Sequence, residues 1–321
     1  MIRKRWVGAG VLLAVVASLT TVQQLLPRPS NTLWWHVVYD AGHVPLFGVF
    51  SLAALGLTLT LVKRPQEHHL RHYVFAFGVT LVAGCLIEVL QWGAPARTAA
   101  LLDVARNMAG SAAFLLLAAT FDPLMAAVTR PRKTLLRAAS VLLIAVSLIP
   151  VGIAGVAIVR RNAAFPRLSE FETRFGRYLL DTRNVEIESP PLRKPWSSEP
   201  VPVNARVTFQ SNRPAVLVFL SPYPDWTAYE RLEFTTFSEH DRPVELSLKI
   251  VDEERLRTLG DVFLAVLTIE PGVNEIVIPL SRVRDLDSGR EMDLTRVHRI
   301  VLSAMEAGEP FSVWMDDLRL E

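Results

Sequence analysis

The feature that most constrains this chain is a series of five apolar runs in its first half, at residues 6–26, 40–62, 73–92, 104–128 and 136–159. Each run is long enough to cross the hydrocarbon core of a membrane, because an α-helix of roughly 20 apolar residues spans about 30 Å. The first run ends without a clear small-x-small cleavage site, so we expect a retained anchor rather than a cleaved signal peptide. The sequence therefore predicts an all-α membrane bundle of five transmembrane helices.

Charge divides the chain into two parts. Residues 1–162 carry a balance of +10, whereas residues 163–321 carry −8. A basic, apolar first half is typical of a membrane part, and an acidic second half of a water-soluble one. The basic residues stand in short runs between apolar stretches, which argues against nucleic acid as a partner. The single cysteine, Cys85, allows no disulfide within the chain, so the soluble part must be stabilised by its core.

Lys and Arg concentrate in alternate connections, at 3–5, 63–71 and 130–137. By the positive-inside rule these connections and the N-terminus lie in the cytoplasm, and the C-terminal part lies outside it. Arg160 and Arg161, after the last span, are exceptions to the rule. His68, His69 and His72 fall on a cytoplasmic connection and are expected to be solvated.

Polar residues at the ends of the spans are costly near a bilayer and therefore indicate a functional site. They form three pairs on shared helix faces: Asp40 with His43, Glu88 with Gln91, and Asp103 with Asn107. The predicted topology places all three pairs, together with Arg97 in a short loop, at the outer boundary of the bilayer. Asp40, His43, Glu88 and Asp103 are candidate catalytic acids or bases, and Gln91, Arg97 and Asn107 candidate ligand-binding residues.

Structural roles for the same residues remain open. Asp40 and Asp103 are favourable N-cap residues, and the whole set is also interpretable as a polar knot that holds three helices together. Arg106 is expected only to snorkel to the interface. A metal site has no support in the spacing, and no cofactor motif is present, so neither a metal nor a cofactor is predicted.

These polar positions resemble the signature of the VanZ-like membrane protein family over about residues 10–128, with Asp40-x-x-His43, Glu88-x-x-Gln91, Arg97 and Asp103-x-x-x-Asn107-x-x-Gly110. The chain departs from the family at 41–42, where Ala-Gly stands in place of a Lys that commonly follows the Asp. The resemblance implies a multi-pass protein of the bacterial cytoplasmic (inner) membrane. It also implies a link to the cell envelope and to resistance against teicoplanin-type glycopeptide antibiotics, but it supplies no mechanism. It does not cover the fifth span.

From about residue 165 the pattern changes to short β runs separated by turn residues, which predicts an all-β sandwich of eight or so strands. The runs are 203–209, 215–220, 231–237, 244–251, 262–269, 275–280, 299–303 and 311–320, and residues 188–202 are expected to form a loop. The segments Phe165-Pro166, Asp225-Trp226, Pro271-Gly272 and Val313-Trp314 resemble the galactose-binding-type jelly roll of many carbohydrate-binding modules. Trp196, Tyr223 and Trp226 are candidates for stacking on sugar rings, although Trp226 fits a core position better.

The predicted domains are a VanZ-like four-helix transmembrane domain at 1–128, a fifth transmembrane helix and linker at 129–162, and an extracytoplasmic β-sandwich at 163–321. One hypothesis is that the chain binds or modifies a lipid-linked glycan or glycopeptide-type amphiphile at the outer leaflet. Its partners would then be a membrane lipid or lipid-linked glycan, a saccharide or an envelope protein. The alternative is a non-catalytic, membrane-anchored interaction module in polysaccharide export or envelope assembly, so the sequence leaves open whether the protein is an enzyme.

Overall fold

The computed structural model describes residues 32–61, 69–92, 101–169, 173–188, 205–210, 214–253, 261–304 and 309–321. For residues 90–92 it describes the backbone and not the side chains. The chain forms two compact units. The first contains Met1–Pro29 and Trp35–Gly152, and the second contains Ser30–Trp34 and Ile153–Glu321.

The described residues before the first strand form six α-helices rather than the five expected. They are α2 (Leu33–Leu61), α3 (His69–Trp92), α4 (Leu101–Ala119), α5 (Ala126–Thr129), α6 (Lys133–Ala164) and α7 (Arg174–Tyr178), with short 3₁₀ turns η1 (Pro123–Met125) and η2 (Arg130–Arg132). Four helical segments are long and apolar enough to cross a membrane, and they correspond to the last four expected spans. The expected span at 6–26 lies outside the described residues. The extra helices are α5 and α7, of four and five residues, which are too short to span.

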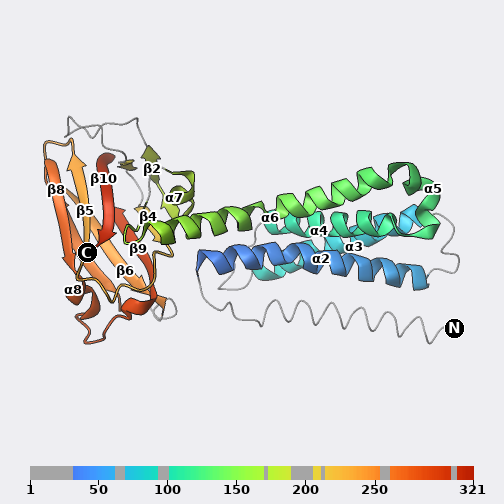
Figure 1. The fold of residues 1–321 in the computed structure, drawn as a ribbon, viewed down its shortest axis with the longest axis horizontal. Helices are drawn as coiled ribbons and strands as arrows, with labels where there is room; N and C mark the ends of the chain where they lie inside the picture. Colours follow the sequence, from blue (N-terminus) through green and yellow to red (C-terminus); the bar gives the residue numbers. More distant parts are fainter. Residues whose placement is uncertain are drawn as a thin grey trace. The chain divides into compact units, whose positions relative to one another are not determined.

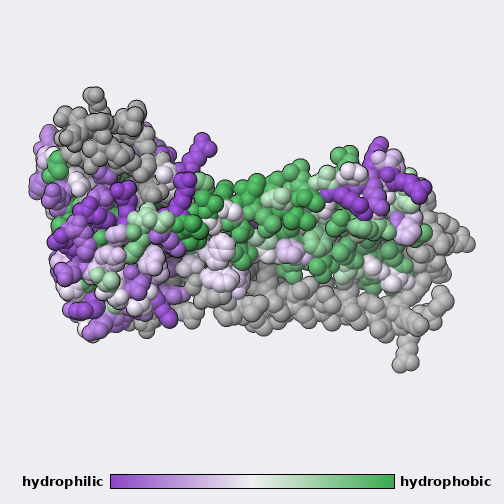
Figure 2. Space-filling view, in the orientation of Figure 1, coloured by the Kyte–Doolittle hydropathy of each residue, from purple (hydrophilic) through white to green (hydrophobic). Residues whose placement is uncertain are grey.

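The helices α2, α3, α4 and the first part of α6 run side by side, and much of the described surface along them is apolar (Figures 1 and 2). Val74 and Val141 are 65% and 63% exposed, although both belong to apolar helices. Such contiguous apolar exposure is what a lipid-facing surface requires. Inside the unit, the Ser140 hydroxyl donates to the Ala113 carbonyl at 2.8 Å and ties α6 to α4.

The start of α3 is anchored to the turn that follows α4. His69 is 6% exposed, and its Nε2 lies 2.7 Å from Oδ2 of Asp122, which also accepts a hydrogen bond from the Tyr73 hydroxyl at 2.9 Å. Burial alone would raise the pKa of Asp122. The hydrogen bonds from His69, the Leu124 backbone N–H and Tyr73 have the opposite and larger combined effect, so the pKa of Asp122 is below its ordinary value. The expectation that His69 is solvated is therefore wrong.

The second unit contains two antiparallel five-stranded sheets, in the orders β1-β4-β9-β6-β7 and β2-β3-β10-β5-β8. The strands are β1 (Leu180–Arg183), β2 (Val185–Glu188), β3 (Ala205–Phe209), β4 (Ala215–Leu220), β5 (Arg231–Ser238), β6 (Val244–Asp252), β7 (Phe263–Ile269), β8 (Gly272–Pro279), β9 (Val297–Ala304) and β10 (Phe311–Leu320). All eight predicted strands are present, and the all-β sandwich is confirmed. The short strands β1 and β2 were not predicted.

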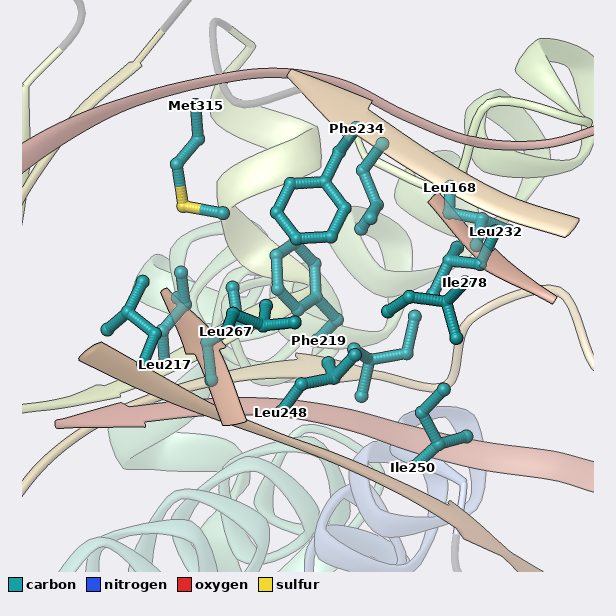
Figure 3. Packing of buried hydrophobic residues seen from close by; sticks show 14 of the residues in the cluster. Leu168, Leu217, Phe219, Leu232, Phe234, Leu248, Ile250, Leu267, Ile278 and Met315 are labelled. Atoms are coloured by element: carbon teal, nitrogen blue, oxygen red, sulfur yellow. The ribbon is translucent and has the colours of Figure 1, made fainter. Parts of the chain in front are cut away.

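Alternating burial along the strands produces the core of this sandwich. In β3 and β4 every second side chain is buried, so each strand contributes one face to the space between the sheets. Phe219, Phe234 and Met315 meet there with aliphatic side chains from both sheets (Figure 3). This single apolar core stabilises the unit without a disulfide.

One buried ion pair connects the end of β6 to the segment before β9. The carboxylate of Asp252 is fully buried and accepts hydrogen bonds from Arg290 Nη2 at 2.7 Å and from the Asp293 backbone N–H at 3.0 Å. Arg290 also lies 3.2 Å from Asp261. Removing one member of such a pair leaves an uncompensated charge in the interior.

We therefore expect Asp252→Ala to destabilise the sandwich by about 1–3 kcal/mol, because the Asp293 backbone N–H loses its acceptor and the Arg290 guanidinium keeps only Asp261 as a carboxylate partner. Hydrogen exchange of the full chain in detergent should show faster exchange across β6 and β9. The control is Arg242→Ala, whose pair with Glu309 is 71% and 81% exposed and should contribute little. Equal protection in the two variants would contradict the assigned role of Asp252.

Candidate functional site

The backbones of α2 and α4 touch at Gly110. A Cβ at this position would lie 2.1 Å from the Val44 carbonyl oxygen, so a side chain cannot fit there. Four residues farther along each helix, a Cβ on Gly48 would lie 2.5 Å from the ring of Phe114. Small residues permit this close packing of membrane helices. The contact sets the register that brings the polar residues of α2 and α4 together.

Asp40 and Asp103 are joined through Arg106. The Arg106 guanidinium lies 2.5 Å from the Asp103 carboxylate on its own helix and 3.3 Å from the Asp40 carboxylate on α2. The side chains of Asp40, Asp103 and Arg106 are 39%, 17% and 24% exposed, so the network is partly accessible. Arg106 is a member of this network rather than a snorkelling residue only, which its position three residues after Asp103 could have indicated.

His43 and Asn107 lie deeper, one turn inside from Asp40 and Asp103. Their side chains are 6% and 0% exposed, and His43 Nδ1 is 2.9 Å from Asn107 Oδ1. Among the described residues, neither Asn107 Nδ2 nor the hydroxyl of Ser111 has a hydrogen-bond partner, and both are buried. A buried amide and hydroxyl without partners are costly in an apolar interior.

The third helix contributes Glu88, which is 6% exposed. Gly84, one turn earlier, faces α4, since a Cβ on it would lie 3.2 Å from Asn107 Nδ2. Because residues four apart share a helix face, Glu88 lies on the side of α3 that faces this seam. The Gln91 side chain and all of Arg97 lie outside the described part of the structure.

We call these six residues together the polar end of the bundle. Its partly exposed outer part consists of Asp40, Asp103 and Arg106, and its buried inner part consists of His43, Glu88 and Asn107. Two carboxylates around one guanidinium leave a net negative charge in the partly exposed outer part. Carboxylates of this kind accept hydrogen bonds from hydroxyl or ammonium groups. Within the described ranges, no group of three His, Cys, Asp or Glu residues is placed to hold a metal ion.

The sugar-stacking candidates of the sandwich lie in different surroundings, and Trp226 has the core position that the sequence analysis favoured for it. Trp226 is fully buried and its Nε1 donates to the Tyr223 carbonyl at 2.6 Å, so its ring belongs to the core and presents no face to a sugar. The ring of Tyr223 is partly buried and lies 4.0 Å, centroid to centroid, from the ring of Phe165. One face of Tyr223 is thus covered. Trp196 lies outside the described residues.

Comparison with known proteins gives matches to solved structures alone. No protein-family model matches the chain, and no curated protein does. An exo-β-agarase is 18% identical over 48% of this chain and 24% of its own, with a TM-score of 0.40. The chain therefore spans about a quarter of that enzyme.

Carbohydrate-binding modules are also among the similar structures. A family 11 module from Clostridium thermocellum, solved with a β-1,3-1,4-mixed-linked tetrasaccharide, is 15% identical over 48% of this chain and 93% of its own, with a TM-score of 0.35. A family 30 module from the same organism is 21% identical over 42% and 86%, with a TM-score of 0.32. At these identities and scores the matches assign no ligand to this chain.

The close approach at Gly110 is testable by adding a single methyl group. We expect Gly110→Ala to destabilise the helical unit by about 1–3 kcal/mol, since the Val44 backbone must move to admit the Cβ. The measurement is thermal unfolding of the full chain in detergent. Gly56→Ala, where no atom lies within 4 Å of the added Cβ, is the matched control on α2 and should be at least as stable as the parent, since Ala is the better helix former. Similar losses in both variants would argue against a specific α2–α4 contact.

Proposed function

We propose that this chain is a VanZ-like, multi-pass protein of the bacterial cytoplasmic membrane that binds a lipid-linked glycan or glycopeptide-type amphiphile. If the protein is an enzyme, this amphiphile is also the substrate that it modifies. The polar end of the bundle is the proposed site, and it faces the outer leaflet. The sandwich lies outside the cytoplasm and recognises a saccharide. A role in resistance to glycopeptide antibiotics follows only from the family resemblance.

The observation that carries the proposal is the gathering of six polar side chains from three apolar helices at one end of the bundle. The carboxylates of Asp40 and Asp103 are partly exposed and suit the hydroxyl groups of a glycan. His43 and Glu88 are buried behind them, where a proton donor or acceptor is protected from bulk water. The apolar surface of the same helices is suited to contact the hydrocarbon chain of such an amphiphile.

A second function is favoured by the way these side chains contact one another. Arg106 is bound by two carboxylates, and His43 by Asn107, as expected of a knot that fixes helix packing. The chain would then be a membrane-anchored interaction module whose sandwich binds an envelope protein. The two functions differ in what the polar residues control: ligand affinity in one, and stability in the other.

Substitution of Asp40 separates these two functions. For a ligand site, we expect Asp40→Asn in nanodiscs to weaken binding of a polyprenyl-diphosphate-linked disaccharide about tenfold or more, since this partly exposed carboxylate would lose a charge-assisted hydrogen bond to a glycan hydroxyl. Its melting temperature should stay near that of the parent. His43→Ala tests the inner part in the same way, and the exposed Glu186→Gln is the matched control. A lowered melting temperature with unchanged binding would instead support the structural knot.

The orientation is testable with the single native cysteine removed by Cys85→Ser. Ala228 in the sandwich and Ala126 in α5 are both exposed and make a matched pair for Ala→Cys substitution. We expect a membrane-impermeant maleimide applied to intact spheroplasts to label Ala228→Cys and to spare Ala126→Cys until the cells are lysed. The reverse pattern would place the sandwich in the cytoplasm and would exclude the proposed outer site.

A further inference from the structure

Arg160 and Arg161 form a cationic pair that the polar end of the bundle does not include. They lie near the C-terminal end of α6, directly after a helix surface that is strongly apolar, where Val156 and Val159 are 43% and 68% exposed. An arginine at the end of an apolar helix is at the level of lipid phosphate groups when the helix spans a bilayer. Both residues belong to the second unit.

Arg161 is partly buried, and the hydrogen bonds it makes within the described residues end on neutral oxygens. Its Nη1 donates to the Ser221 carbonyl, and its Nε and Nη2 donate to Asn162 Oδ1 at 3.1 and 2.7 Å. Arg160 stacks over the ring of Phe175, with its guanidinium carbon 4.7 Å from the centroid. A partly buried guanidinium with neutral partners retains its attraction for an anion.

A groove of about 420 Å³ opens beside Arg161 and lies entirely within the second unit. Apolar side chains form most of its wall: Trp34, Ile158, Val159, Pro222, Pro224 and Val297. Arg161 and Ser221 are among the polar residues that line it. An apolar wall with a cation beside it has the chemistry of a site for an amphiphile with an anionic headgroup.

We propose that this groove binds an anionic phospholipid, with the phosphate on Arg161 and the upper part of an acyl chain along the apolar residues of α6. Charge complementarity selects a headgroup of net negative charge over a zwitterionic one. The site uses none of the residues at the polar end of the bundle, so it stands or falls independently of the proposed glycan site.

The test is lipid binding by the purified full chain in dodecyl maltoside, followed by native mass spectrometry. For the parent we expect phosphatidylglycerol to bind at least tenfold more tightly than phosphatidylcholine, and Arg161→Gln to remove this preference. Arg161→Lys keeps the charge and should keep the preference. The control is Arg167→Gln, since Arg167 already has Asp317 at 3.7 Å and its loss should leave lipid selection unchanged.

Three results would overturn the proposal. They are equal affinity for the two lipids in the parent, an unchanged preference in Arg161→Gln, and occupancy by free inorganic phosphate that matches phosphatidylglycerol. Folding of each variant is checked by its melting temperature without lipid. If Arg161→Gln does not fold, Arg161→Met with added phosphatidylglycerol replaces it, and retention of the preference there has the same meaning.

Discussion

The contact between the backbones of α2 and α4 is the constraint on which the polar end of the bundle depends. With no side chain at Gly110, the Val44 carbonyl approaches α4 directly, and this fixes both the distance and the register of the two helices. Asp40 then lies within reach of Arg106, and His43 within reach of Asn107. The polar contacts then join the two helices at positions that the glycine contact brings together.

The two units distribute polar and apolar side chains between interior and surface in opposite ways. The sandwich has a conventional interior, in which alternating apolar side chains meet between two sheets and one buried charge, Asp252, is paired with Arg290. The helical unit exposes apolar side chains and collects buried polar ones inside. Hydroxyls of Thr58 and Thr80 bond to carbonyls four residues earlier on their own helices, so they need no partner from lipid.

Much of this architecture was predictable because it follows from periodicity. Long apolar runs predicted the four described spans, and alternation predicted the eight longer strands. The strands β1 and β2 were not predicted because each has four residues: β1 is mostly exposed and has no alternation, and the alternation of β2, with Val185 and Ile187, is too short to identify a strand. The contacts of Arg106 and His69 were not predicted for a different reason. Helix periodicity shows on which side of a helix a residue lies, but not which neighbouring helix packs against that side.

The contacts of Arg160 and Arg161 affect how these two cations count in the positive-inside rule. The positive-inside rule counts cations that remain near the membrane, and Arg160 and Arg161 count against an outward sandwich. Both are engaged by the second unit, since Arg161 donates to the Ser221 carbonyl and Arg160 stacks on Phe175. Residues that fold together with a large domain follow that domain, whose translocation depends little on its charge. The predicted orientation therefore depends on the three basic connections alone, which agree with one another.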